Sequence, residues 1–135
     1  INAHAAFDEA ASVRQALHLD VTAGVWPVEP EKFDAILNCN MIHIAPWKVC
    51  AGLMAGASRV LKTGGTLVTY GPYKRNGMHT ASSNEQFDQT LKLRNMNWGV
   101  RDLEAVIEVA KDNGLVFDEM VEMPANNYCI IYKMS

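Results

Sequence analysis

The chain has 135 residues, of which 49% are hydrophobic and 20% charged, a composition typical of one globular domain with a substantial core. Its formal net charge of −3 disfavours a protein that binds nucleic acid, because such proteins present a basic face to the phosphates. No apolar run approaches the roughly 18 residues of a membrane span. We therefore expect neither a nucleic-acid nor a membrane partner.

The first part of the chain predicts a helix, a short strand, a loop and a buried strand. Residues 2–15 are rich in alanine, which favours a helix. Residues 16–21 (ALHLDV) alternate and predict a strand, while the glycine and prolines of residues 22–32 predict a loop. Residues 33–40 (FDAILNCN) have a nearly continuous apolar centre, which is typical of a strand covered on both faces in a parallel sheet.

The middle of the chain predicts two helices around another strand. Pro46 suits the first turn of a helix that ends before Gly64. Residues 66–70 (TLVTY) predict a strand, and residues 71–82 predict a loop. Ser83 and Gln86 fit a capping box, which begins a helix running to about Asn95.

The last part predicts one helix and two strands. Asp102 can cap a helix whose apolar stripe includes Leu103 and Val106. Residues 115–123 and 128–134 predict strands joined by a linker short enough for an antiparallel hairpin. The alternation of strands and helices therefore predicts an α/β fold with a mostly parallel sheet, to which the hairpin adds one antiparallel strand.

Several blocks of the sequence resemble a known family. FDAILNCNMIHI and RVLKTGGTLVTY resemble the fourth motif, and the helix and strand that follow it, of class I S-adenosylmethionine-dependent methyltransferases. YGPYKRNG, LRNMNWGVRD and EMPANNYCIIYK are similar to the methyltransferase-like protein 26 family and its bacterial relatives. The resemblance runs from about residue 16 to the C-terminus and implies a Rossmann-like sheet. That family is assigned to methyltransferases mainly by its fold, with no defined substrate.

The resemblance also indicates what this sequence does not contain. The sheet of the family begins with a strand and a glycine-rich loop that approaches the cofactor, and its second strand ends in an acid that holds the ribose. No G-x-G-x-x-G run or similar loop occurs in the sequence. We therefore expect residues 1–135 to form a single truncated methyltransferase-like domain, an incomplete Rossmann-like sheet without the first two strands of the family.

Candidate cofactor-binding residues follow from the resemblance. Asp20 and Val21 close the third strand of the family, where an acid faces the adenine of S-adenosylmethionine. Asn38, Asn40 and Met41 end the fourth strand, and ligands of open α/β sheets bind at the carboxyl ends of strands. Each position has a structural alternative, because Asp20 also suits a turn and the two asparagines also suit buried backbone groups.

Candidate substrate residues follow the fifth strand or lie on the later loops. They are Tyr70, Tyr73, Asn76, Trp98, Arg101, Asn126 and Asn127. Trp98, Arg101 and Asp102 fit either a substrate clamp or an aromatic lid over the core beside an ion pair. His43 is interpreted as a packing residue rather than a base, and no catalytic residue is assigned.

The cysteines and histidines predict no metal site. Cys39, Cys50 and Cys129 form no C-x-x-C pair, and His4, His18 and His79 have no ligand spacing with them. Because the cysteines lie in apolar runs, we expect buried free thiols in a reducing compartment and hence a cytoplasmic protein.

Without the first two strands, residues 33–40 would form an edge of the sheet. The unpaired backbone groups of an edge strand favour association with another strand. Residues 16–21 can move in beside it, another chain can supply strands, or two copies can pair as a symmetric dimer. We favour a homodimer through residues 33–40.

Two functions are compatible with these features. The first is a truncated methyltransferase-like protein of undefined substrate that does not bind S-adenosylmethionine alone and serves as an oligomeric binding or assembly module. The alternative is an S-adenosylmethionine-dependent methyltransferase acting on a small molecule or a protein, whose cofactor site is completed by upstream residues or a partner chain. The sequence favours the first for this polypeptide, and affinity for S-adenosylhomocysteine separates the two.

Overall fold

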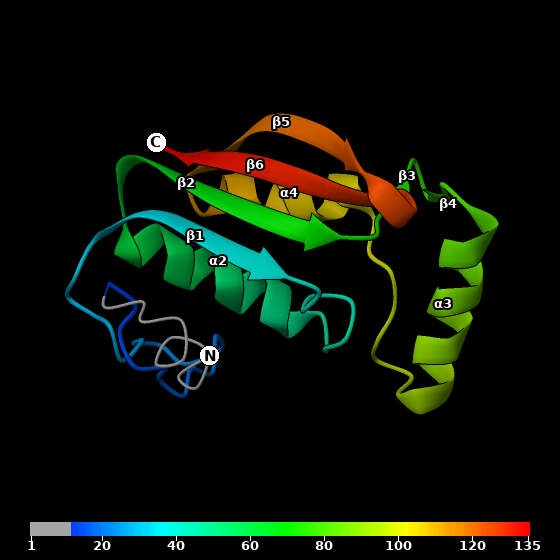
Figure 1. Cartoon of the computed structure of the whole chain (residues 1–135), viewed down its shortest axis with the longest axis horizontal. Helices are drawn as coiled ribbons and strands as arrows, with labels where there is room; N and C mark the ends of the chain where they lie inside the picture. Colours follow the sequence, from blue (N-terminus) through cyan, green and yellow to red (C-terminus); the bar gives the residue numbers. More distant parts are fainter. Residues whose placement is uncertain (1–11) are drawn as a thin grey trace.

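A computed structural model describes residues 12–135 of the chain. A four-stranded sheet with strand order β1-β2-β6-β5 forms its centre (Figure 1). The strands are β1 (Phe33–Cys39), β2 (Leu61–Gly71), β5 (Leu115–Met123) and β6 (Asn127–Met134). β1 pairs parallel with β2, and β6 is inserted antiparallel between β2 and β5, so β1, β2 and β5 all run in one direction. The predicted α/β fold with a mostly parallel sheet and a closing hairpin is confirmed.

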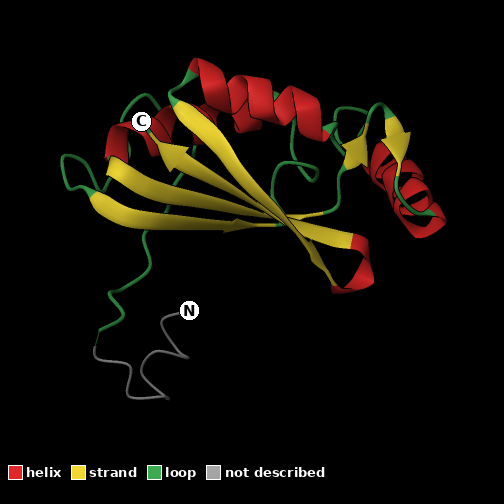
Figure 2. Cartoon of the chain, turned by 90° about the horizontal axis from the view of Figure 1, so that it is seen from above, coloured by secondary structure: helices red, strands yellow, loops and turns green. Residues whose placement is uncertain are grey.

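Two helices, α2 (Lys48–Val60) and α4 (Leu103–Asp112), cover one face of the sheet (Figure 2). Their apolar stripes supply most of the helical side of the core. The fully or nearly fully buried side chains include Leu53, Met54 and Val106 on these helices, and Leu67, Ile130 and Tyr132 on the strands beneath them. The described helices leave the opposite face of the sheet uncovered, because α3 (Ser82–Arg94) lies beyond the carboxyl end of β2 (Figure 1).

Residues 16–21 do not form the predicted strand. They run without regular structure, and the apolar side chains of Leu17 and Leu19 are 60% and 41% exposed. A strand is stable only beside a paired strand, and this segment has no such neighbour among the described residues. The predicted helix over residues 2–15 lies largely outside the described residues, and residues 12–15 are not helical.

The loop over residues 22–32 is confirmed, and it is anchored by Trp26. This side chain is 3% exposed and its indole lies across Gly56 in α2. A Cβ added to Gly56 would lie 1.9 Å from Cζ2 of Trp26, so only glycine admits the indole. The close contact at Gly56 is thus made by the side chain of a loop residue, Trp26.

The connections on either side of α3 correct two local predictions. A small hairpin of β3 (Lys74–Arg75) and β4 (Met78–His79) occupies part of the predicted loop. The predicted capping box does not form, since α3 begins at Ser82 and the residue before it, Ala81, offers no side-chain cap. A short turn of 3₁₀ helix, η1 (Pro124–Asn126), joins β5 to β6.

The thiols are free, but they are not all buried as predicted. Cys50 is fully buried in α2, Cys129 is half-buried and Cys39 is exposed. The difference arises because Cys39 lies on an edge strand, on the face of the sheet that none of the described helices covers. No helix of the described residues is long and apolar enough to cross a membrane.

Candidate functional site

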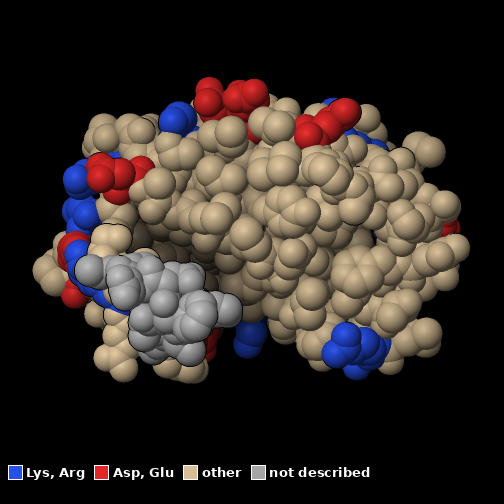
Figure 3. Space-filling view, viewed as in Figure 1, with Lys and Arg blue, Asp and Glu red and all other residues tan. Residues whose placement is uncertain are grey.

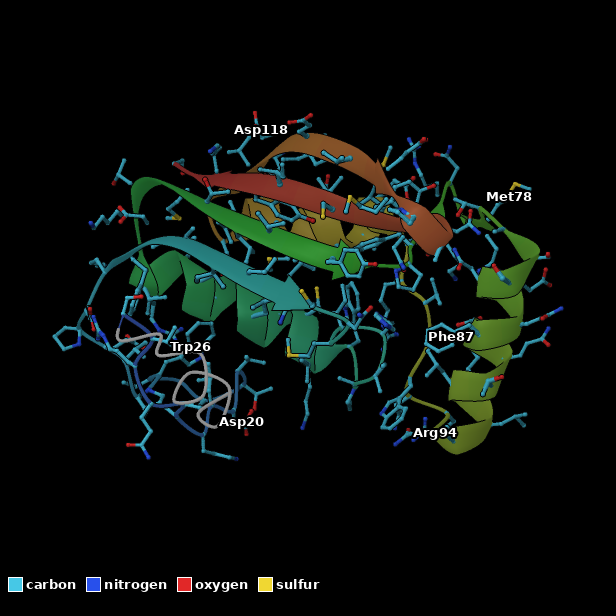
Figure 4. The ribbon with its side chains drawn as sticks, in the orientation of Figure 1. Asp20, Trp26, Met78, Phe87, Arg94 and Asp118 are labelled. Carbon is cyan, nitrogen blue, oxygen red and sulfur yellow. The ribbon has the colours of Figure 1, made fainter. Side chains whose placement is uncertain are left out.

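A groove of about 540 Å³ opens where β1 and β2 end. Four segments meet there: the turn after β1, the residue after β2, the first half of α3, and the connection from β5 to β6. The residues that line the groove are Asn40, His43, Ile44, Pro72, Ser83, Asn84, Phe87, Ala125, Asn126 and Asn127. Figure 4 shows Phe87 extending from α3 toward the end of the sheet. The carboxyl ends of the paired strands β1 and β2 thus form the floor of this groove.

Asn40 turns the chain at the end of β1. Its backbone N–H donates to the carbonyl of Tyr70 at 2.9 Å, which continues the pairing of β1 with β2 for one more residue. Its φ of 53° is left-handed, a conformation that asparagine tolerates better than most residues. The side chain is exposed at the groove, so this turn presents a carboxamide to a ligand.

His43 packs behind that turn and is 2% exposed. Its ring meets Phe87 edge-on, with centroids 5.8 Å apart, and a Cβ on Gly71 would lie 3.0 Å from its Cε1 atom. Burial, together with the positive charge of Arg101, lowers the pKa of His43 to about 4. The imidazole is therefore uncharged at neutral pH. It packs against Phe87 and Gly71, and it also lines the groove.

The opposite wall is held by amide hydrogen bonds. The Nδ2 atom of Asn84, a buried residue of α3, donates to the carbonyl of Asn126 at 3.2 Å. Nδ2 of Asn127 donates to the hydroxyl of Tyr70 at 3.1 Å. Ala125 and Asn126 both have left-handed backbone conformations, with φ of 61° and 60°. For alanine this conformation is strained, and such strain gathers at functional sites.

Arg101 fixes the back of the site. Its guanidinium donates to the carbonyls of Ile42, Ala45 and Asn97, at distances of 3.2, 2.7 and 2.8 Å. It also lies 5.5 Å from the ring of Trp47. These bonds tie the turn after β1 to the segment before α4, so Arg101 positions the groove and takes no part in an ion pair with Asp102.

The structure brings some of the predicted residues together. Asn40, Asn126 and Asn127 line the groove, and Tyr70 supports it through Asn127. Asn38 and Met41 lie at the end of β1 and contact each other, with Nδ2 of Asn38 3.6 Å from Sδ of Met41, but they do not line the groove.

Three predicted substrate residues lie elsewhere. Tyr73 is 1% exposed and its hydroxyl is 2.8 Å from Oγ1 of Thr69, so it belongs to the core. Asn76 turns the β3–β4 hairpin, where its N–H donates to Glu104 at 2.7 Å. The ring of Trp98 lies 5.6 Å from the guanidinium of Arg94. Tyr73 does not reach the rim because the chain turns inward after β2, whereas Asn76 lies on the β3–β4 hairpin and Trp98 on the segment after α3.

Asp20 and Val21 also lie away from the groove. Oδ1 of Asp20 accepts bonds from the N–H and the hydroxyl of Thr22, at 2.9 and 2.7 Å, and these bonds lower the pKa of Asp20. The carbonyl of Val21 accepts the indole N–H of Trp26 at 3.2 Å. Figure 4 shows Asp20 beside α2 and Phe87 on α3, well apart from each other. Within the described part of the chain, Asp20 and Val21 therefore do not meet the residues of the groove.

Seven of the ten described residues that line the groove are not among the predicted site residues. They include His43, which the sequence indicates as a packing residue, and Asn84 and Phe87, which lie on the helix predicted to begin at Ser83. The helical pattern of residues 82–94 contains no signal that α3 leaves the sheet and closes the groove. Among the described residues no three metal-ligating side chains gather at this groove or elsewhere.

Comparison with known proteins identifies the family and the fold. A family model described as a protein of unknown function (DUF938) matches residues 1–134. The fold is similar to that of the mitomycin 7-O-methyltransferase MmcR, with a TM-score of 0.80 at 12% identity over 99% of this chain and 38% of that chain. It is also similar to CalO1, a methyltransferase in calicheamicin biosynthesis solved with S-adenosylhomocysteine, with a TM-score of 0.69 at 12% identity over 90% and 34%.

A third similar structure is an O-methyltransferase family 2 protein from Planctomyces limnophilus in complex with apigenin. Its TM-score is 0.73 at 19% identity, over 86% of this chain and 34% of that chain. The chain thus spans between 34% and 38% of the length of these three methyltransferases. At these identities the likeness shows the fold, a partial Rossmann-like methyltransferase fold, and the resemblance noted in the sequence is confirmed.

Proposed function

The chain belongs to the DUF938 family and has a methyltransferase-like fold, and we propose that it provides the acceptor side of an S-adenosylmethionine-dependent methyltransferase acting on a small molecule. The observation that carries the proposal is the groove at the carboxyl ends of β1 and β2, where ligands of open α/β sheets bind. Its volume lies in the range of about 300–1,000 Å³ found for small-molecule sites.

The similar structures support this proposal. CalO1 was solved with S-adenosylhomocysteine and the Planctomyces protein with apigenin, a small aromatic molecule. Because Asp20 and Val21 lie away from the groove, we propose that other residues complete the cofactor site, either of the same polypeptide or of a partner chain. The residues described here then bind and orient the acceptor.

Three groups of the groove have distinct roles in this proposal. The imidazole of His43 accepts a hydrogen bond from a hydroxyl of the acceptor. It can accept this bond because its lowered pKa leaves the ring unprotonated at neutral pH. The ring of Phe87 packs on a flat part of the acceptor. The carboxamides of Asn40 and Asn126 fix its orientation, since positioning supplies much of the rate of a group transfer.

The proposal is tested by methyl transfer. The purified protein is incubated with labelled S-adenosylmethionine and a library of small hydroxylated molecules, and labelled products are counted. We expect transfer to a subset of them and a reduction of about tenfold or more in His43→Ala and Phe87→Ala. Asn97→Ala, in an exposed loop outside the groove, is the matched control.

Calorimetric titration with S-adenosylhomocysteine completes the test. Binding in the micromolar range supports a cofactor site completed around this chain. No labelled product and no binding, with the protein folded by circular dichroism, would contradict the methyltransferase proposal.

A second candidate function, a binding or assembly module, is favoured by one specific observation. β1 has no paired strand on its outer side among the described residues, and Leu37 at its centre is 69% exposed. Such an edge is a template for pairing with another chain. This candidate predicts a stable oligomer without affinity for S-adenosylhomocysteine.

A further inference from the structure

We infer that the groove selects uncharged molecules that carry both a flat apolar part and hydrogen-bonding groups. The inference deepens the proposed function, because it names the acceptor class of the same site. It rests on the chemistry of the side chains that line the groove and on the bonds that the neighbouring charged side chains make elsewhere.

Among the residues that the structure describes, no acid, lysine or arginine lines the groove. The lining consists of carboxamides, one hydroxyl, one imidazole and apolar groups. Figure 3 shows charged side chains mainly at the margins of one face of the molecule, with uncharged groups over its centre. A charged ligand would lose water on entering the groove and find no opposite charge there, which is unfavourable.

The charged residues nearest the groove have other partners. Asp88, which follows Phe87, accepts the N–H of Val100 at 2.8 Å and pairs with Lys92 at 2.9 Å. The guanidinium of Arg101 donates to backbone carbonyls. Glu85 in the first turn of α3 offsets the positive end of the helix dipole, which would otherwise favour an anion.

The polar groups of the groove remain available to a neutral ligand. Within the described part of the chain, the side chains of Asn40 and Asn126 make no hydrogen bond to the protein. Asn84 and Asn127 use only their Nδ2 donors, which leaves their Oδ1 acceptors. A carboxamide presents both donors and acceptors, so it matches hydroxyl, carbonyl and amide groups equally well.

The apolar groups of the groove favour a flat ligand. Phe87 and Ile44 are 36% and 37% exposed, and both line the groove with Pro72. An exposed aromatic ring next to carboxamides gives a ring-shaped ligand a surface to pack on while its substituents reach the amides. The hydrogen bond from Nδ2 of Asn84 to the carbonyl of Asn126 anchors this rim to α3, and anchoring of this kind reduces the entropy lost on binding.

The inference is tested with three molecules of nearly equal size that differ in charge. These are 4-hydroxybenzamide, which is neutral, 4-hydroxybenzoate, which is an anion, and tyramine, which is a cation. Binding to the protein is measured by titration of backbone amide NMR shifts, with no cofactor present. We expect the amide to bind about tenfold or more tightly than either charged molecule, with the largest shifts at Asn40, Phe87 and Asn126.

A charge-switch variant makes the test specific to the groove. Asn126→Asp places a carboxylate on the rim and keeps a residue type that tolerates the left-handed backbone. We expect tyramine to bind about fivefold or more tightly to this variant than to the wild type, and the benzoate to bind more weakly. The matched control is Asn76→Asp, which alters another left-handed asparagine, with φ of 53°, in the β3–β4 turn.

Each outcome decides the inference independently of the proposed function. Equal or tighter binding of a charged molecule, absence of binding by all three, or an equal effect of Asn76→Asp would overturn it. Selective binding of the amide without any methyl transfer would leave the inference standing and remove the proposed function. Methyl transfer to a charged acceptor would overturn the inference and leave the proposed function standing.

Discussion

Trp26 is the residue that attaches the loop before β1 to the rest of the domain. Its indole lies across Gly56 of α2, its Nε1 donates to the carbonyl of Val21 at 3.2 Å, and the guanidinium of Arg59 lies 5.9 Å from the ring. Trp26 is a large aromatic side chain that is 3% exposed, and burial of such side chains contributes strongly to stability. The fit of the indole against Gly56 is therefore an important part of what holds the loop.

We predict that Gly56→Ala displaces Trp26. The added methyl group would lie 1.9 Å from Cζ2 of the indole, and overpacking of this kind costs about 1–3 kcal/mol, more than the gain in helix propensity of about 1 kcal/mol. The free energy of unfolding in urea should fall, and the tryptophan emission should move to longer wavelength. Gly24→Ala is the control, because its Cβ would meet nothing within 4 Å, and an equal effect of both changes would contradict the prediction.

At the scale of elements, α3 depends on one buried carboxylate for its position beyond the sheet. Oδ1 of Asp88 accepts the N–H of Val100 at 2.8 Å, and Oδ2 lies 2.9 Å from Nζ of Lys92 and 3.5 Å from Nε2 of His79. Burial raises the pKa of Asp88, but the bonds from Lys92 and Val100 outweigh it and the pKa is lowered overall. Since α3 carries part of the groove, this carboxylate also positions Asn84 and Phe87.

We predict that the contribution of Asp88 to stability is lost in acid. A carboxyl whose pKa is lower in the folded than in the unfolded state stabilises the fold above its unfolded pKa of about 3.9, and the effect disappears as the pH falls through the folded pKa. Asp88→Asn should therefore lower the free energy of unfolding by about 1 kcal/mol at pH 7 and by less near pH 3.

Urea unfolding at the two pH values measures this difference. Glu85→Gln, an exposed change on the same helix, should leave the free energy of unfolding within about 0.5 kcal/mol of the wild type. An Asp88→Asn effect that does not shrink in acid would show that the carboxylate acts by packing rather than by charge.

The elements that were predictable from the sequence are those whose pattern is local. The apolar run predicted as a strand over residues 33–40 forms β1 over residues 33–39, but the prediction that both of its faces are covered is wrong, because Leu37 is 69% exposed. The turn residues around Pro124 join the two strands of an antiparallel hairpin, as predicted. Residues 16–21 alternate just as clearly but form no strand, because pairing depends on a neighbour that their own pattern does not specify. Ser83 has the spacing of a cap, but the helix begins one residue earlier at Ser82.

The candidate site was predictable in part for the same reason. Asn40, Asn126 and Asn127 follow strand ends, and strand ends meet at one edge of a sheet, so their proximity follows from the order of the elements. Phe87 reaches the groove because α3 lies beyond the end of the sheet, and His43, in the turn after β1, meets its ring there, so this pairing depends on tertiary packing. Tyr73 follows a strand too, but the chain turns inward after Pro72 and buries it.

At the scale of the whole molecule, the described helices cover one face of the sheet and leave the other uncovered. The helices α2 and α4 pack on the first (Figure 2). On the second, Leu37 of β1 lies beside Val68 of β2, which lies beside Ile131 of β6, so three apolar side chains form a continuous row across the strands. Leu37, at the edge, is 69% exposed. An apolar row that ends at an unpaired strand is a surface suited to another copy of this chain.

We therefore propose that two copies pair through β1. We predict that the wild type is a dimer and that a single lysine introduced on β1 prevents the pairing. Antiparallel pairing of two β1 strands would satisfy their outer backbone groups and join the two apolar rows, whereas Leu37→Lys would bring two like charges together. Sedimentation equilibrium between about 1 and 100 μM should show a dimer for the wild type and a monomer for Leu37→Lys.

The opposite edge of the sheet supplies the control for this last prediction. Val116 lies on β5, the other edge strand, and is 54% exposed, so Val116→Lys makes the same change in a comparable setting. If pairing occurs through β1, this variant remains a dimer. A monomeric wild type would contradict the dimer itself, and a dimer lost in Val116→Lys but kept in Leu37→Lys would move the interface to β5. Because the groove lies at the ends of β1 and β2, pairing along β1 would place the grooves of the two copies in one assembly.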